Sequence, residues 1–341
     1  MTDTPFISYG QNHEDVVLWR ALSGVVAGRY VEVGANHPTD DSITRAFYDR
    51  GWSGLTVEPV PAFAALHRQQ RPRDQQVEAA VTDAEADEIT LHVIPNTGLS
   101  TLVDGIKARH VDRGWDVEDL TVPTARLDTL LEATGWGRSD IQFLIVDVEG
   151  SEAQVLSTID LSVWRPWVLV IEATLPNSAE STAGEWEPGV LAAGYEFCLF
   201  DGVSRFYVAK EHVDLKQALS YPACVLDSFV PAQVVQLDVL HAQQLATLQK
   251  EQAEALASES EKRADTTRQL LFWRARALQA WAAPVASAPS TSLTAELAAA
   301  RTEITRLLEH IAVMEGTISW RVTAPLRAVR KAQFAISGRG Q

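Results

Sequence analysis

The sequence has 341 residues, of which 46% are hydrophobic and 22% charged, a balance typical of a soluble globular protein with one large core and an extension. Its formal net charge of −16 argues against nucleic acid as a partner, and its two cysteines, Cys198 and Cys224, lack the neighbours that a zinc site or a disulfide framework needs. Because the first residues lack the basic and apolar regions of a signal peptide, and no run reaches 18 apolar residues, we expect a cytoplasmic protein without a membrane span.

Apolar runs rich in β-branched residues alternate with helical patterns in the first two thirds of the chain. The expected strands are 30–34, 53–58, 76–81, 88–94, 140–147, 167–172, 195–200 and 204–209, and the expected helices are 12–23, 60–70, 124–134, 151–158 and 184–193. This alternation predicts a mostly parallel α/β sheet with helices on both faces. The short link at 200–203 (FDGV) predicts a hairpin, so that the last strand runs antiparallel to the others.

The character of the sequence changes after residue 215, which ends the first predicted domain. We expect domains at 1–215, a helical region at 216–283, a Pro/Ser/Ala linker at 284–292, a coiled coil at 293–319 and a basic amphipathic tail at 320–341.

The predicted coiled coil rests on apolar residues whose spacing alternates between four and three. They are Leu293, Leu297, Ala300, Ile304, Leu307, Ile311, Met314 and Ile318. This heptad predicts a left-handed coiled coil and hence a homo-oligomer, with dimer and trimer both open. The alternative is an amphipathic helix that docks on the globular domain.

The tail after Glu315 contains no acidic residue and mixes arginines with aromatic and aliphatic side chains. Such a segment suits a membrane surface or an acidic protein partner, while a solvated terminus is the alternative. Pro325 limits any long helix there.

The stretch YVEVGANHP (30–38) ends an apolar strand in an acidic residue, Glu32, and a single glycine, Gly34. A dinucleotide site needs further glycines to bring a pyrophosphate to a helix N-terminus, so a nicotinamide oxidoreductase is disfavoured. A nucleoside that carries a positive charge and no phosphate needs a nearby carboxylate instead. The pattern therefore favours a cationic nucleoside as the ligand.

Two further acidic residues close predicted strands at the same edge of the sheet. Glu58 ends the next strand and is placed to bind the two hydroxyls of a ribose, and Asp147 ends the run FLIV. Ligands of doubly wound sheets bind beyond the carboxyl ends of the strands, so we expect these carboxylates to converge on one pocket.

An ordered series of motifs resembles the FkbM family of S-adenosylmethionine-dependent methyltransferases over residues 8–210. The motifs are Ser8-Tyr9-Gly10-Gln11, 30–38, Gly51-Trp52-Ser53-Gly54, Val57-Glu58-Pro59, Gly98-Leu99-Ser100-Thr101, 147–152, Trp164-Arg165-Pro166, Val170-Ile171-Glu172, Gly194-Tyr195 and Asp201-Gly202. The resemblance implies a class I methyltransferase fold, a Rossmann-like doubly wound sheet of seven strands with the last antiparallel. His37-Pro38 stands where methyltransferases often carry another glycine, which leaves open how the methionine end of the cofactor is held.

The resemblance also implies roles for single residues. The residues expected to hold S-adenosylmethionine are Glu32, Gly34, Ala35, Asn36, Glu58, Asp83 and Asp147, with Asp83 near the adenine. The acceptor side is expected to include Ser8, Gln11, Ser100 and Thr101.

Methyl transfer to a hydroxyl oxygen needs a base or a metal ion, because a hydroxyl is a poor nucleophile. His37, Asp147 and Glu149 are the candidates for the base. Alternatively, Asp147, Glu149 and Glu172 hold Mg²⁺ through oxygen ligands.

The acceptor is expected to be a sugar hydroxyl in a bacterial surface polysaccharide or glycolipid. Residues 314–327 resemble the end segment of bacterial enzymes that assemble such polysaccharides, which implies an enzyme peripheral to the inner face of the cell membrane. Two alternatives stay open: an O-methyltransferase of a small natural product, and a coiled-coil scaffold with a degenerate methyltransferase domain.

Overall fold

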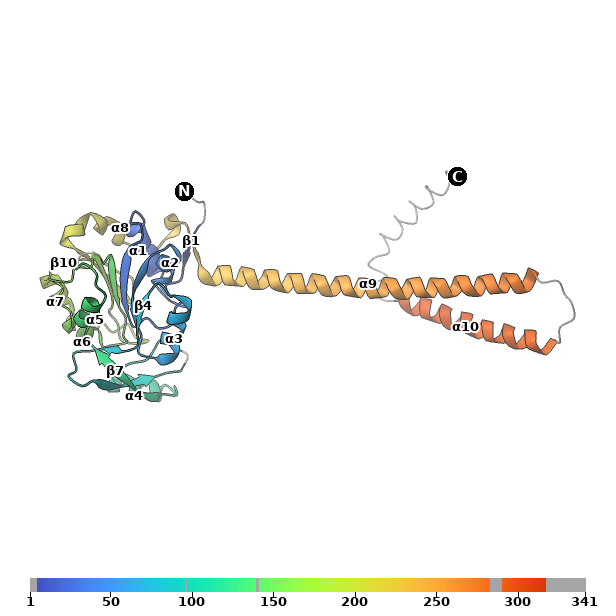
Figure 1. Cartoon of the computed structure of the whole chain (residues 1–341), viewed down its shortest axis with the longest axis horizontal. Helices are drawn as coiled ribbons and strands as arrows, with labels where there is room; N and C mark the ends of the chain where they lie inside the picture. Colours follow the sequence, from blue (N-terminus) through green and yellow to red (C-terminus); the bar gives the residue numbers. More distant parts are fainter. Residues whose placement is uncertain (1–4, 96, 139–140, 283–289, 317–341) are drawn as a thin grey trace. The chain divides into compact units, whose positions relative to one another are not determined.

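The computed structural model describes residues 5–95, 97–138, 141–282 and 290–316, and the chain divides into two compact units, Met1–Leu240 and His241–Gln341. The first unit is built on a seven-stranded sheet with the order β10-β11-β9-β8-β2-β3-β4 (Figure 1). Its strands are β2 (Arg29–Val33), β3 (Ser53–Val57), β4 (Gln75–Val77), β8 (Phe143–Val146), β9 (Val168–Glu172), β10 (Tyr195–Phe200) and β11 (Ser204–Ala209). Only β11 runs antiparallel to its neighbours, which confirms the predicted hairpin and the doubly wound fold.

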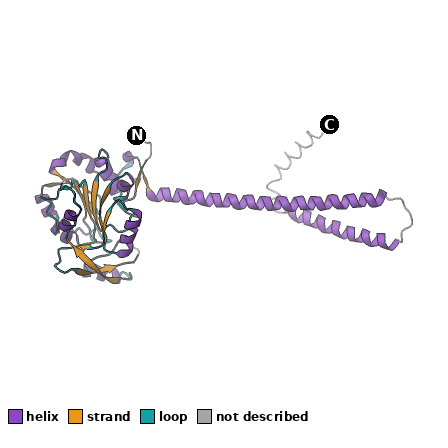
Figure 2. Ribbon diagram, in the orientation of Figure 1, coloured by secondary structure: helices purple, strands orange, loops and turns teal. Residues whose placement is uncertain are grey.

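Helices cover both faces of this sheet, as Figure 2 shows. Successive residues of a strand point to opposite faces, so Val31 and Leu144 enter one apolar core while Tyr30 and Phe143 enter the other. The first core also takes side chains from α5 (Leu127–Ala133), α6 (Glu152–Ser157) and α7 (Glu187–Ala192), and the second from α1 (Glu14–Leu22), α2 (Arg45–Asp49) and α8 (Lys216–Leu219). Burial on both faces explains the unbroken apolar runs of the central strands.

A second, three-stranded sheet was not predicted. It has the order β5-β7-β6, with β5 (Ala80–Val81), β6 (Glu88–Val93) and β7 (Glu118–Ala125). The expected strand 76–81 is therefore divided, because β4 pairs with β3 in the large sheet and β5 with β7 in the small one. The expected helix 124–134 was wrong at its start, since residues up to Ala125 pair with neighbouring strands.

Two further helices connect strands of these sheets along the sequence. The helix α3 (Pro61–Gln70) follows β3 and has a proline in its first turn, where the missing amide hydrogen is not needed. The helix α4 (Asp104–Asp112) connects β6 to β7 and buries Ile106 and His110. Neither the small sheet nor α4 has the long apolar run that marked the central strands.

The first unit extends beyond the predicted boundary at residue 215. A parallel pair of short strands, β1 (Phe6–Ser8) and β12 (Phe229–Pro231), joins its beginning to its end. Arg20 forms an ion pair of 2.7 Å with Asp227. It also donates hydrogen bonds to the carbonyl oxygen of Ala218, within α8, and to that of Tyr221, which follows α8. The remaining short elements are η1 (Ala183–Glu185), η2 (Lys210–Leu215) and η3 (Val225–Asp227). These contacts are long-range, so the local change in composition at 215 did not indicate them.

The second unit is helical, as predicted. The helix α9 (Ala232–Ala282) begins in the first unit and continues into the second, and α10 (Ser290–Gly316) contains the expected heptad up to Met314. Leu307 of that seam is buried, whereas Leu293 and Leu297 are exposed. Most of the predicted linker and the whole basic tail lie outside the described residues. The pairing of the seam with another chain stays a prediction. No described helix is long and apolar enough to cross a bilayer.

Candidate active site

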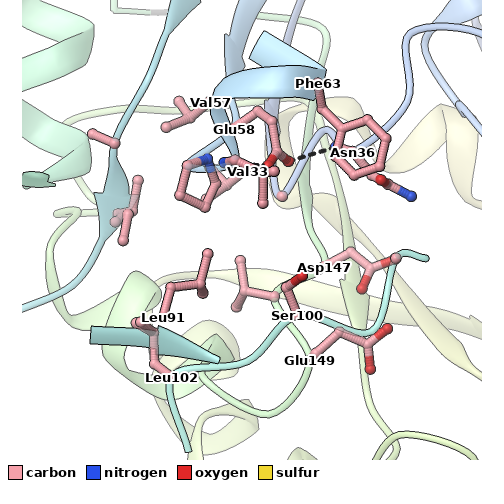
Figure 3. A pocket seen from close by; sticks show the side chains of 18 of the residues that line it. Val33, Asn36, Val57, Glu58, Phe63, Leu91, Ser100, Leu102, Asp147 and Glu149 are labelled. Atoms are coloured by element: carbon pink, nitrogen blue, oxygen red, sulfur yellow. Dashed lines mark hydrogen bonds between the residues drawn. The ribbon is translucent and has the colours of Figure 1, made fainter. Parts of the chain in front are cut away.

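A cavity lies at the carboxyl ends of β2, β3 and β8 (Figure 3). It contains about 570 Å³ of space, part of it open to solvent. Its walls are largely apolar and include Val57, Val60, Phe63, Leu91 and Leu102. The charged residues in the described part of its wall are all acidic: Glu58, Asp147 and Glu149.

The single glycine at the end of β2 is required by the packing of the strand ends. Gly34 has φ +83°, a conformation that L side chains rarely adopt, and an added Cβ would lie 1.7 Å from the carbonyl oxygen of Asp147. Its amide donates to the carbonyl of Val57 at 3.0 Å. Gly34 thus lets the loops after three strands meet at the cavity.

Glu58 is held in one orientation at the cavity wall. Its Oε2 accepts a hydrogen bond from the Asn36 amide at 2.8 Å, and its Oε1 accepts one from the Val60 amide at 2.7 Å. Burial raises the pKa of Glu58 to about 7, although the two amides act in the opposite direction. Each oxygen keeps a lone pair for a further donor, which fits the two neighbouring hydroxyls of a ribose.

Glu32 is not part of the cavity wall. Its carboxylate accepts a hydrogen bond from the Thr44 hydroxyl at 2.6 Å and lies 3.9 Å from Nη1 of Arg71. Burial raises its pKa to about 7, while the Arg71 guanidinium lowers it. Arg71 also forms an ion pair with Asp74 at 2.7 Å. In this structure Glu32 belongs to a buried network with Thr44, Arg71 and Asp74, and its expected contact with a cofactor stays a prediction.

Three carboxylates come together where β8 and β9 end. Asp147 and Glu149 belong to the loop after β8, Glu172 is the last residue of β9, and one oxygen of each lies within 4.8 Å of the others. Figure 3 shows Asp147 and Glu149 next to each other at the cavity. Burial raises the pKa of all three, to about 9 for Glu149 and well above the usual value for Glu172. We refer to this group as the carboxylate cluster.

The loop that carries the cluster is fixed from two sides. The Glu152 carboxylate accepts hydrogen bonds from the amides of Val148 at 3.3 Å and Gly150 at 3.0 Å. The Thr101 hydroxyl donates to the carbonyl of Glu149 at 2.8 Å. Glu149 itself has φ +54°, a backbone conformation that costs a non-glycine residue about 1 kcal/mol and that is concentrated at functional sites.

The remaining residues expected to bind cofactor lie at different places. Asn36 lines the cavity, whereas Ala35 is buried outside its wall and Asp83 is exposed. His37 is also outside the wall: its Nδ1 accepts from the amides of residues 39 and 40, and its ring packs edge-on against Phe63, which lines the cavity.

The four residues expected on the acceptor side are divided as well. Ser100 lines the cavity, and Thr101 supports the loop of the cluster. Ser8 is buried, and its hydroxyl donates to Asp15 at 2.7 Å, while Gln11 is exposed.

Two residues near the site were missed by the sequence reasoning. Phe63 forms part of the cavity wall from the first turn of α3. His67, one turn later, is fully buried and donates from Nε2 to the carbonyl of Asn36 at 3.0 Å. Burial lowers the pKa of His67 to about 4, so it is neutral there. Helical periodicity alone marks neither residue as part of a site.

Comparisons with known proteins identify a family domain in the chain. The family model of the methyltransferase FkbM domain matches residues 32–197. Solved structures similar to this one include a TehB-like SAM-dependent methyltransferase from Corynebacterium glutamicum, 10% identical, which covers 57% of this chain and 88% of that one with a TM-score of 0.32. Another is an O-methyltransferase from Bacillus cereus in complex with SAH, 12% identical, which covers 58% and 80% with a TM-score of 0.30. No curated protein matches the sequence. Residues 32–197 are an S-adenosylmethionine-dependent methyltransferase domain of the FkbM family.

Proposed function

We propose that this methyltransferase acts on a hydroxyl oxygen of a sugar in a bacterial surface polysaccharide or glycolipid. The observation that carries the oxygen specificity is the carboxylate cluster of Asp147, Glu149 and Glu172 beside the cofactor cavity. A hydroxyl must lose a proton as it is methylated, and the cluster offers several carboxylate oxygens that can assist.

The residues of the cavity fit S-adenosylmethionine. Glu58 presents two fixed carboxylate oxygens for the ribose hydroxyls, and Val60, Phe63 and Leu91 offer apolar surface for the adenine. The described wall carries no basic side chain for a phosphate, which agrees with a phosphate-free nucleoside. When bound, the cofactor supplies an electrophilic methyl group on a positively charged sulfur.

Transfer of that methyl group would form a carbon–oxygen bond to the acceptor and break the carbon–sulfur bond, whose electron pair would stay on the sulfur. The hydroxyl proton passes to a base on the protein. Asp147 and Glu149 are the candidates at the cavity, and His37, which lies just outside the wall, is the third.

The choice of a sugar acceptor rests on the sequence. The heptad of α10 and the basic segment after it resemble the extension of bacterial polysaccharide-assembly enzymes, and such an extension suits an enzyme held at the inner membrane surface or at a protein of the assembly machinery. An O-methyltransferase of a small natural product has no evident need for it. A scaffold with a degenerate domain is disfavoured by the ordered Glu58 site.

The test is incubation of the full chain with methyl-labelled S-adenosylmethionine and a bacterial lysate separated into glycolipid, polysaccharide and small-molecule pools. Label in either of the first two pools that resists mild alkali supports a methyl ether on a sugar hydroxyl. Alkali-labile label indicates a methyl ester on a carboxyl group and contradicts oxygen transfer to a hydroxyl. Label only in small molecules favours the natural-product alternative. No transfer in any pool, with cofactor binding intact, favours the scaffold.

A further inference from the structure

The carboxylate cluster brings three acidic side chains together: an oxygen of each of Asp147, Glu149 and Glu172 lies within 4.8 Å of the others. Buried acidic groups without a cation are costly, so the arrangement requires either shared protons or a positive ion.

A second observation points to an ion. Glu172 is only 6% exposed, and its Oε2 has no hydrogen-bond partner among the described residues. The Oε2 of Glu149 is also buried and has no partner in the described part of the chain. Unsatisfied carboxylate oxygens are rare in protein interiors, and here two of them belong to side chains whose oxygens already lie within 4.8 Å of one another and of Asp147.

From this we infer that Asp147, Glu149 and Glu172 bind one divalent cation of the kind that prefers oxygen ligands, such as Mg²⁺ or Mn²⁺. Such ions commonly take a few carboxylates from the protein and complete their shell with water and substrate oxygens. Softer ions that need sulfur or imidazole are disfavoured, because the cluster contains neither.

The surrounding loop is built to hold these ligands in place. Glu152 fixes two amides of the loop and Thr101 fixes the Glu149 carbonyl, so the strained backbone of Glu149 keeps its carboxylate at the cluster. Support of this kind around ligands is typical of metal sites. The role of the ion rests on the proposed function: it would bind the acceptor hydroxyl and favour loss of its proton.

The experiment measures the ion itself. The full chain is freed of metal with a chelator, and Mn²⁺ is titrated in without cofactor or acceptor while free Mn²⁺ is followed by electron paramagnetic resonance. We expect one Mn²⁺ per chain, displaced by excess Mg²⁺. Glu172→Gln and the less buried Glu149→Gln are each expected to weaken binding by at least about tenfold. Glu58→Gln is the matched control, a carboxylate of the same cavity outside the cluster, and is expected to keep Mn²⁺ affinity.

Two results would overturn the inference: a native chain that takes up no Mn²⁺, and equal binding by the native chain and both cluster variants. If there is no uptake and the Glu172→Gln variant is more stable than the native chain, the carboxylates share protons instead. S-adenosylhomocysteine binding is measured in the same samples by calorimetry. If S-adenosylhomocysteine binds and Mn²⁺ does not, the metal site is wrong and the methyltransferase assignment stands. If Mn²⁺ binds and S-adenosylhomocysteine does not, the proposed function is wrong and the metal site stands.

Discussion

Glu58→Gln is expected to weaken the binding of S-adenosylhomocysteine, the product form of the cofactor. Both oxygens of Glu58 already accept backbone amides, from Asn36 and Val60, so the new NH₂ group must face one of these donors. One charge-assisted hydrogen bond to the ribose is lost as well, a loss of about 2–3 kcal/mol. This corresponds to roughly a 30- to 160-fold weaker affinity.

Calorimetry on the full chain measures this affinity, and thermal unfolding verifies that the variant is folded. Asp83→Asn is the control, because Asp83 is exposed and outside the cavity wall, and its affinity is expected to stay within about twofold of the native value. A folded Glu58→Gln protein with an affinity within about threefold of the native one would refute the ribose contact.

The same contact predicts a pH dependence. Burial raises the pKa of Glu58 to about 7, and the carboxylate must be ionised to accept both ribose hydroxyls. The affinity of the native chain should therefore fall as the pH drops through about 7, and this change should be absent from Glu58→Gln. Calorimetry from pH 6 to pH 8 tests it; a variant with the native pH profile would assign the titration to another group.

Three further outcomes follow from the structure. Gly34→Ala should lower the free energy of unfolding by about 3–5 kcal/mol in urea denaturation, because its Cβ would overlap the Asp147 carbonyl and its φ is positive; a loss below about 1 kcal/mol contradicts this. Burial raises the pKa of Glu14 to about 8, so the contribution of this group to stability is present below pH 4.5 and is lost as the pH rises through 8. The Glu14→Gln variant should therefore be as stable as the native chain near pH 4 and more stable by a few kcal/mol near pH 8.5. A chain ending after Leu240 should keep native S-adenosylhomocysteine affinity, whereas one ending at residue 215 should unfold at a lower temperature, since it lacks β12; equal stability of the two would contradict the β1–β12 contact.

The large sheet could be predicted because its strands are buried on both faces. Runs such as FLIV at 143–146 have no other common explanation in a soluble domain, and the link at 200–203 indicated the hairpin. The strand β7, in contrast, is largely exposed on alternate positions and contains Pro123, so its sequence EDLTVPTA gives no apolar run. Its strand character comes from pairing with β6, which is a tertiary contact.

For the site, the sequence pattern predicted that the acidic residues at the strand ends lie at one edge of the sheet, but it did not predict which side chains they contact. Glu32, Glu58 and Asp147 all end parallel strands or lie one residue from the end, as the pattern indicated. Whether a carboxylate turns toward the cavity depends on its neighbours, however. Arg71 and Thr44 engage Glu32, and these residues come from separate helical or loop segments that no local pattern connects to β2.

The strand pair that closes the first unit sets a condition on folding during synthesis. Phe6 pairs with Phe229, so β1 gains its strand partner only after almost all of this unit has been synthesised. Until then its backbone groups are an open edge on which another nascent chain can assemble.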